Sequence, residues 1–470
     1  MVATLPNQED PSSWEELQDD QHECRVFQRG CHHDGTFVRV YVPNKATDPS
    51  QPLQTIQYLH GFALCLPAFY EAHLLALAKQ GWIVIFPDFQ RSTYRTEPLE
   101  SSKQAPTKVH SLKWGRTIRR LLFRGREQML LLEDLPHELD IQPLSQSKRL
   151  ACSLPELRVK DLRRVLLPWL LIQLVLVVIG WFRRTYARNL GELLSTVLLS
   201  LAYSPEDWLR NAATLSQNAW ADLASLPEYS HWRSSPQQFY GFGHSLGGLL
   251  ALSLPTLQPK DQTRYFRPKA ILACDPATST IMGIPRFATW LLRLFNSPFT
   301  AAPLDIKQVG PTLTIPVTIL HGLEDTIVPP QLWAVQGGKG GFDAIASPTK
   351  GIYFASSNRM LDPSLIAFHN QAVTSTQTFD DTLFRSFGGA KIGPNAYNVN
   401  WIWPALTALF AEGVSPDDLL QHLGPQPFDV SSNPPASRSH LWAWLLMMTG
   451  LLAIIAFHFA KQGMALPSRV

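Results

Sequence analysis

Short apolar runs, separated by turns and helical patterns, recur through much of the chain. A strand pattern at residues 24–27, a turn and an alternating run at 36–42 predict an antiparallel hairpin. Apolar runs that do not alternate are typical of parallel strands buried on both faces. They occur at residues 55–62, 82–86, 270–274, 317–321 and 351–355, and another strand begins at residue 238; helical patterns cover residues 69–79, 204–223 and 396–410. The chain is therefore predicted to be an α/β protein with a mostly parallel sheet flanked by helices.

One strand is followed by the pattern Gly-x-Ser-x-Gly. Gly243, Ser245 and Gly247 lie between the strand that begins at residue 238 and the apolar run 249–252. Small residues two positions before and after a serine allow a sharp strand-to-helix turn that exposes the serine hydroxyl above the sheet. Ser245 is therefore a candidate nucleophile. The N–H of Leu246, at the start of the helix, is a candidate donor to a developing oxyanion.

Partners for such a serine follow later in the chain. Asp325 lies in the turn after the strand at 317–321, and His369 comes after the strand at 351–355. A histidine that takes the proton of a serine, and an acid that orients the histidine, form the arrangement used in nucleophilic catalysis. We therefore predict a triad of Ser245, Asp325 and His369. Asp275, which also ends a strand, is the alternative acid.

Other histidines and cysteines have simpler interpretations. Three histidines precede or follow glycines at strand ends and are expected to fix loops: His60, His244 and His321. The group Cys24, Cys31, His32 and His33 lacks a second ligand pair at a zinc spacing, so neither a metal nor another cofactor is expected. The chain has five cysteines at scattered positions. This pattern argues against a disulfide framework and favours a reducing compartment.

Residues 93–203 interrupt the αβ alternation and form a basic, apolar insertion. They contain 18 Lys and Arg against 10 Asp and Glu, a net charge of +8 in a chain whose total is +3. Residues 165–182 carry no charge and lie between two arginine pairs. A single crossing there would separate the two halves of the sheet. We expect an interfacial helix rather than a hairpin with 190–203 as its second arm, because that arm is short and contains Glu192.

A second apolar stretch lies near the carboxyl end. Residues 441–460 are long enough to span a bilayer as a helix and follow a proline-rich linker. Only 17% of the chain is charged, below the roughly 25% usual for globular proteins, which also favours membrane contact. The predicted organisation is a polar N-terminal segment (1–23), a first part of the core (24–92), a helical insertion serving as lid or membrane dock (93–203), a second part of the core (204–414), a linker (415–440) and a transmembrane helix (441–460).

The motifs together resemble those of the α/β-hydrolase superfamily. They are His60-Gly61-Phe62, Pro87-Asp88, the sequence around Ser245, His321-Gly322-x-x-Asp325-x-x-Val328-Pro329 and the late His369. Within it, the chain is most similar to the branch of chlorophyllases, dienelactone hydrolases and polyester-hydrolase-like enzymes, over roughly residues 24–92 and 204–412. The resemblance implies an oxyanion hole made by the N–H groups of Phe62 and Leu246, acylation of Ser245 and release of the acid by water activated by His369. Some chlorophyllase-like members use the acid at the position of Asp275.

These features predict a membrane-associated serine hydrolase that cleaves carboxylic esters with an apolar or lipid-like portion. An acyltransferase that uses the same acyl-enzyme is one alternative, and a non-catalytic membrane scaffold on a hydrolase fold is another. The expected partners are an apolar ester or lipid and a membrane. Nucleic acid is not expected, because the basic insertion is interrupted by an uncharged apolar segment. The cysteine pattern and the absence of a visible signal peptide favour the cytosolic face for the catalytic part.

Overall fold

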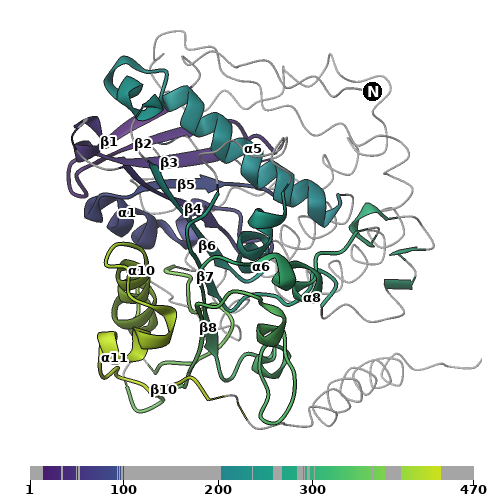
Figure 1. Cartoon of the computed structure of the whole chain (residues 1–470). Helices are drawn as coiled ribbons and strands as arrows, with labels where there is room; N and C mark the ends of the chain where they lie inside the picture. The colour runs from purple at the N-terminus through teal and green to yellow at the C-terminus, as the bar shows by residue number, and fades with distance from the viewer. Residues whose placement is uncertain are drawn as a thin grey trace, which may run out of the picture.

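A computed structural model gives the arrangement of the folded core (Figure 1). It describes residues 14–99, 203–257, 267–375, 393–433 and 435, apart from short gaps at 33–34, 49, 51–52, 93, 95, 97–98, 235–236, 283–288, 291, 294–296, 301 and 362–363. Both predicted halves of the core contribute strands to one sheet.

The described strands form a ten-stranded mixed sheet. In spatial order they are β1 (Glu15–Asp19), β2 (Cys24–Arg29), β3 (Val38–Pro43), β5 (Ile83–Pro87), β4 (Leu53–Leu59), β6 (Gln237–His244), β7 (Ile271–Cys274), β8 (Val317–Gly322), β9 (Lys350–Ala355) and β10 (Val430–Ser431). The strands from β5 to β9 run parallel, and the pairs at both edges are antiparallel. The carboxyl ends of β4, β6, β7, β8 and β9 therefore meet at one edge of the sheet, where ligands gather in folds of this kind.

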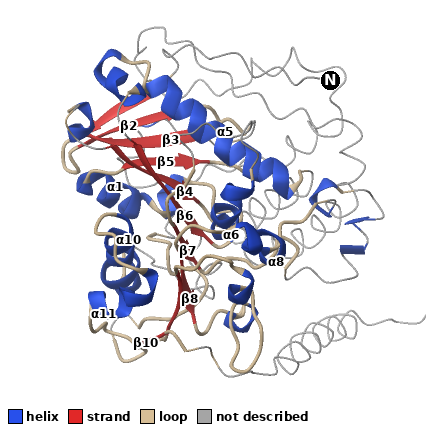
Figure 2. Cartoon of the chain, in the orientation of Figure 1, coloured by secondary structure: helices blue, strands red, loops and turns tan. Residues whose placement is uncertain are grey.

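Helices cover both faces of the sheet (Figure 2). One face carries α1 (Glu71–Gln80), α10 (Trp403–Phe410) and α11 (Leu419–Leu423), and the other carries α5 (Pro205–Leu223), α6 (Leu246–Ser253) and α8 (Ile306–Val309). Each face of the sheet forms its own hydrophobic core with the helices that cover it. Side chains along β7 alternate between them: Leu272 lies in the core beside α1, α10 and α11, whereas Ile271 and Ala273 lie in the core beside α5, α6 and α8. Because both faces are buried, the central strands are mostly apolar, and their few polar side chains, such as Gln57, are buried as well.

Helix α5 begins where its sequence predicts. The Ser204 hydroxyl accepts a hydrogen bond from the N–H of Asp207 (3.0 Å), and the Asp207 carboxylate accepts one from the N–H of Ser204 (3.1 Å). Pro205 occupies the first helical position, where a missing N–H has no cost. This capping box fixes the start of the helix after the 93–203 insertion.

The sheet extends further than the sequence predicts at both ends. Strand β1 lies inside the segment 1–23 that we expected to stand outside the core, and it pairs with β2. Its sequence, Glu-Glu-Leu-Gln-Asp, is polar because it forms an exposed edge, so it carries no apolar alternation. Helix α11 and strand β10 lie inside the expected linker 415–440. The linker prediction is therefore wrong for α11 and β10, which pack against the core through Leu419 and Val430, and Phe428 between them is buried in the same core.

The predicted membrane segments at 165–182 and 441–460 lie outside the described residues. Within the ranges that are described, no helix combines the length and the apolar character that a bilayer crossing needs. Three described cysteines (Cys24, Cys65 and Cys274) are free and buried, but Cys31 is disulfide-bonded. The odd number and scattered spacing of the cysteines did not predict the disulfide at Cys31.

Replacing Ser204 by alanine should lower the free energy of unfolding by about 1 kcal/mol, because the N–H of Asp207 loses its acceptor. Urea denaturation measures the change. Ser230→Ala is the control: Ser230 is exposed and its hydroxyl only donates to the carbonyl of Pro227, so we expect a change below about 0.5 kcal/mol. Equal effects of the two substitutions would show that the capping box does not stabilise α5.

Candidate active site

The turn between β6 and α6 has an unusual backbone. Ser245 has φ 55° and ψ −118°, a conformation that residues with a side chain rarely adopt. A Cβ added to Gly243 would lie 2.2 Å from the carbonyl oxygen of Gly247, and one added to Gly247 would lie 2.2 Å from that of Leu59. Both flanking positions therefore require glycine, and the strained turn is held by close backbone packing on each side.

Hydrogen bonds to the next strand hold Ser245 in this conformation. Its N–H donates to the carbonyl of Cys274 (2.9 Å), and its carbonyl accepts from the N–H of Ala277 (3.0 Å). The side chain stands at the carboxyl edge of the sheet and is 8% exposed. The turn thus presents the hydroxyl at the edge where the loops after β4, β8 and β9 also converge.

The loop after β9 brings His369 to this hydroxyl. Nε2 of His369 lies 2.6 Å from Oγ of Ser245, and Nδ1 lies 2.7 Å from Oδ2 of Asp325. A carboxylate can only accept, so Nδ1 carries a proton and Nε2 is free to accept the serine proton. The structure therefore connects the three residues that the sequence singled out as a triad. In such an arrangement the histidine can act as a general base towards the serine.

Asp325 is built to remain ionised. Its second oxygen, Oδ1, accepts from the N–H groups of Ile327 (2.8 Å) and Val328 (2.9 Å). Burial alone would raise the pKa of Asp325, but the charge and hydrogen bond of His369, together with the backbone donors, hold the pKa below its usual value. A negative charge at this position stabilises the imidazolium that forms when His369 takes a proton.

Asp275, the alternative acid, has different partners. Its Oδ1 accepts from the N–H of Gly322 (2.8 Å) and from Nε2 of Gln371 (3.0 Å), and not from the imidazole of His369. Burial and the nearby charge of Asp325 raise the pKa of Asp275 well above its usual value. The structure therefore places Asp325 beside the histidine and places Asp275 behind it. Gln371, which belongs to no motif of the sequence, connects Asp275 to the loop that carries His369.

The backbone N–H groups of Phe62 and Leu246 have no acceptor among the described residues. Leu246 is the first residue of α6, where an N–H has no intrahelical partner. A Cβ on Gly247 would touch the carbonyl oxygens of both Leu59 and His60, so the loop that contains Phe62 packs on the first turn of α6. The predicted oxyanion donors thus come from adjacent segments, and Leu246 lies at the positive end of helix α6.

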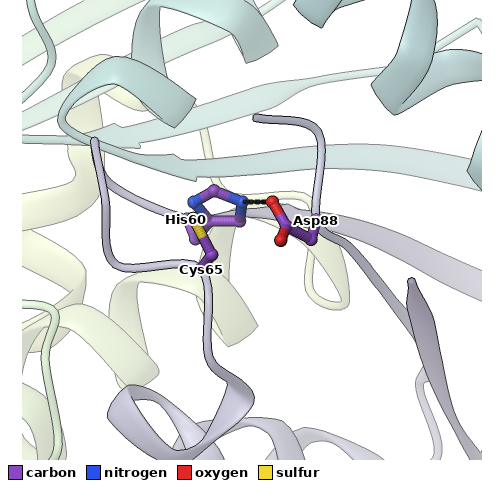
Figure 3. Close-up of side chains that lie close together, drawn as sticks. All are labelled: His60, Cys65 and Asp88. Atoms are coloured by element: carbon purple, nitrogen blue, oxygen red, sulfur yellow. Dashed lines mark ion pairs between the residues drawn. The ribbon is translucent and has the colours of Figure 1, made fainter. Parts of the chain in front are cut away.

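A buried polar network supports the Phe62 loop, and Figure 3 shows two of its members, His60 and Asp88. Asp88, at the end of β5, accepts a hydrogen bond from Nδ1 of His32 (2.7 Å), and Nε2 of His60 lies 3.5 Å from its other oxygen. Burial opposes ionisation of Asp88, but the two histidines outweigh it and lower the pKa of its carboxyl. Gln90, bound to Asp88 through its own N–H, accepts from the N–H of Ala63 (2.7 Å). The network thereby fixes the residue that follows Phe62.

Two clusters combine ligand types that metals use: His60, Cys65 and Asp88, and Asp275, His321 and Asp325. In both clusters the carboxylate oxygens already accept hydrogen bonds from protein donors, which a metal would have to displace. His60 and His321 donate through Nδ1 to the carbonyl of the glycine that follows each of them, which orients both rings; their Nε2 atoms have no hydrogen-bond partner among the described residues. We interpret both clusters as hydrogen-bond networks that hold loops, the structural role that the sequence suggested for these histidines.

Gly247→Ala should destabilise the fold by about 3 kcal/mol or more, because the new methyl group would overlap the carbonyl oxygen of Leu59. The midpoint of urea unfolding measures this effect. Gly241→Ala, in strand β6 just before the turn, is the control: the nearest atom to its new methyl group is Cγ1 of Ile271 at 3.5 Å, an ordinary contact, so the change should stay within about 1 kcal/mol. A tolerated Gly247→Ala would contradict the packing of the turn described above.

Several solved structures are similar to the chain. One is a protein from Thermus thermophilus, with 16% identity, 71% of this chain and 89% of that chain covered, and a TM-score of 0.31. A second is the acetyl xylan esterase of Paenibacillus sp. R4, with 13% identity, 73% of this chain and 80% of that chain covered, and a TM-score of 0.33. A third comes from the metagenome-derived lipolytic enzymes LipS and LipT, with 12% identity, 64% of this chain and 83% of that chain covered, and a TM-score of 0.29. No family model and no curated protein matches the chain. Similarity at this level does not transfer an activity. The strand order, the strained serine turn and the Ser, Asp, His order along the chain are those of the α/β-hydrolase fold.

Proposed function

We propose that this chain is a serine hydrolase that cleaves carboxylic esters through an acyl-enzyme on Ser245. The observation that supports the proposal is the unbroken chain of hydrogen bonds from Ser245 through His369 to Asp325. A serine hydroxyl is a weak nucleophile without a base, and this arrangement supplies one that is held in the required tautomer.

The proposed reaction has two halves. His369 takes the proton of Ser245 as Oγ attacks the ester carbonyl, and the N–H groups of Phe62 and Leu246 bind the oxyanion. His369 then protonates the departing alcohol, which leaves the acyl group on Ser245. Water, deprotonated by His369, attacks the acyl carbon, and collapse of the second tetrahedral intermediate releases the acid and restores the serine. An acyltransferase would differ only in the acceptor that replaces water.

Apolar side chains beside the site support an apolar acyl or alcohol portion. The ring of Phe62 packs against that of Trp208, with 6.1 Å between the ring centroids. The ring of Trp208 also packs against that of Phe299, with 5.8 Å between the ring centroids. Ile281 and Met282, in the loop after β7, are only partly buried. Ile327, close to Asp325 in sequence, is 39% exposed. Such surroundings favour ester substrates whose carbon chains gain free energy on leaving water.

We also propose that the substrate reaches the site from a membrane. The proposal rests on the sequence of 93–203, with its net charge of +8, and on the apolar stretches 165–182 and 441–460. Basic residues near an anionic leaflet attract the chain, and apolar helices anchor it. In this proposal the insertion acts as lid and membrane dock for the site.

The two aspartates give the sharpest test of the catalytic proposal. Asp325→Asn should lower kcat for a short p-nitrophenyl ester by about 10⁴-fold, because an amide favours the wrong imidazole tautomer. Asp275→Asn should change kcat by less than about tenfold, since Asp275 already has a raised pKa and an amide oxygen can accept from the same donors. Steady-state hydrolysis by detergent-solubilised protein measures both. A larger loss in Asp275→Asn would make Asp275 the acid of the triad.

Shortening the insertion tests delivery from the membrane. Deleting residues 155–198 leaves all five cysteines in place, and it leaves Tyr94, whose hydroxyl donates to the carbonyl of Ala63. This deletion should lower kcat/KM at least about tenfold for an ester embedded in anionic vesicles, and less than about twofold for a short soluble ester. An equal loss on both substrates would contradict a docking role.

A further inference from the structure

A second histidine, which the proposed reaction does not use, lies directly beside the nucleophile. His244 precedes Ser245 and is fully buried. Its Nε2 lies 2.9 Å from the carbonyl oxygen of His369, and its Nδ1 lies 2.9 Å from the hydroxyl of Tyr70. Both ring nitrogens therefore have partners, and one partner is the backbone of the proposed general base.

Tyr70 continues this connection to the oxyanion side of the site. Its hydroxyl oxygen lies 2.9 Å from the backbone nitrogen of Gly61, the residue before Phe62. A backbone N–H can only donate, so the tyrosine oxygen accepts from Gly61 and its own proton goes to Nδ1 of His244. The proton of the neutral imidazole then lies on Nε2, which donates to the carbonyl of His369. All three hydrogen bonds are satisfied by one set of proton positions.

The protonation states agree with this assignment. Burial lowers the pKa of His244 to about 3, with the nearby His369 adding to the effect, so the imidazole is neutral at physiological pH. Burial also raises the pKa of Tyr70, so its hydroxyl keeps its proton. The imidazole tautomer of His244 and the direction of the Tyr70 hydroxyl are therefore both fixed. The hydrogen bonds that link Gly61 to His369 cannot rearrange to accommodate a shift of either loop.

The packing around His244 leaves the two loops little freedom. A Cβ on Gly61 would lie 2.9 Å from Nδ1 of His244, so a glycine is needed where the imidazole crosses the oxyanion loop. On the histidine side, the N–H and hydroxyl of Thr374 both donate to the carbonyl of Phe69 (2.7 and 3.1 Å). The segment that carries Tyr70 therefore contacts both loops.

We propose that Tyr70 and His244 are positioning residues that hold the oxyanion loop and the His369 loop in one fixed relation. The N–H of Phe62 and Nε2 of His369 must act on the same ester group, and they belong to loops far apart in sequence. The hydrogen bonds that link Gly61 through Tyr70 and His244 to His369 fix the distance between the N–H of Phe62 and Nε2 of His369. This inference rests on the hydrolase function proposed above.

The test compares two buried tyrosines that make the same kind of hydrogen bond. Tyr70→Phe removes only the hydroxyl that joins the two loops. Tyr58→Phe is the matched control, because the Tyr58 hydroxyl bonds to Nδ1 of His73 (3.0 Å) in the same core but outside the site. For a p-nitrophenyl ester, Tyr70→Phe should lower kcat by about tenfold to a hundredfold with KM changed less than about twofold, as expected when reacting groups are misplaced but binding is kept. Tyr58→Phe should change kcat less than about twofold. The melting temperatures of the two variants should fall by similar amounts, because each variant loses the hydroxyl of one buried tyrosine.

His244 variants provide an independent measurement on the same link. A glutamine can place an amide N–H near the position of Nε2 and donate to the carbonyl of His369, whereas leucine cannot. His244→Gln should therefore retain at least about tenfold more kcat than His244→Leu. Equal kcat values in Tyr70→Phe and Tyr58→Phe, or in the two His244 variants, would overturn the positioning role while leaving an active hydrolase. A folded wild-type protein without ester hydrolysis would instead overturn the proposed function, and this inference with it.

Discussion

The strained backbone at Ser245 is the constraint on which the site depends. A serine with φ 55° is held only because the carbonyl of Cys274 accepts its N–H, the N–H of Ala277 donates to its carbonyl, and two glycines allow backbones to approach closely. The same turn starts α6 at Leu246, so one short segment provides both the hydroxyl and an N–H group that faces no described acceptor. The parallel sheet supplies the rest, because its carboxyl edge brings the loops of four further strands to this turn.

Electrostatics then divides two neighbouring carboxyl groups into different roles. Asp325 and Asp275 are both buried, and ionising both would place two negative charges together in a medium that screens them poorly. Asp325 receives His369 and two backbone donors, which lower its pKa, whereas Asp275 has a raised pKa and bonds to Gln371. The arrangement keeps one negative charge where an imidazolium forms. The second acid anchors the histidine loop from behind.

The sequence predicted those parts of the molecule whose signal is local. The central strands were found because burial on both faces makes them mostly apolar, and the candidate triad because its order along the chain matches the fold. Edge strand β1 escaped detection because its residues are polar and exposed, and β10 because it has two residues. The choice between Asp325 and Asp275 needed geometry, since both end neighbouring strands. The link through Tyr70 and His244 joins positions 61, 70, 244 and 369, and no local pattern records such a contact.

Covalent labelling with a fluorophosphonate probe, followed by mass mapping of the modified peptide, tests the central claim most directly. The account predicts a single adduct on Ser245 in the folded, detergent-solubilised protein, and no adduct in Ser245→Ala or His369→Ala. A folded wild-type protein that is not labelled, or one whose adduct lies on another serine, would contradict it and would favour a scaffold that keeps the hydrolase fold without its chemistry.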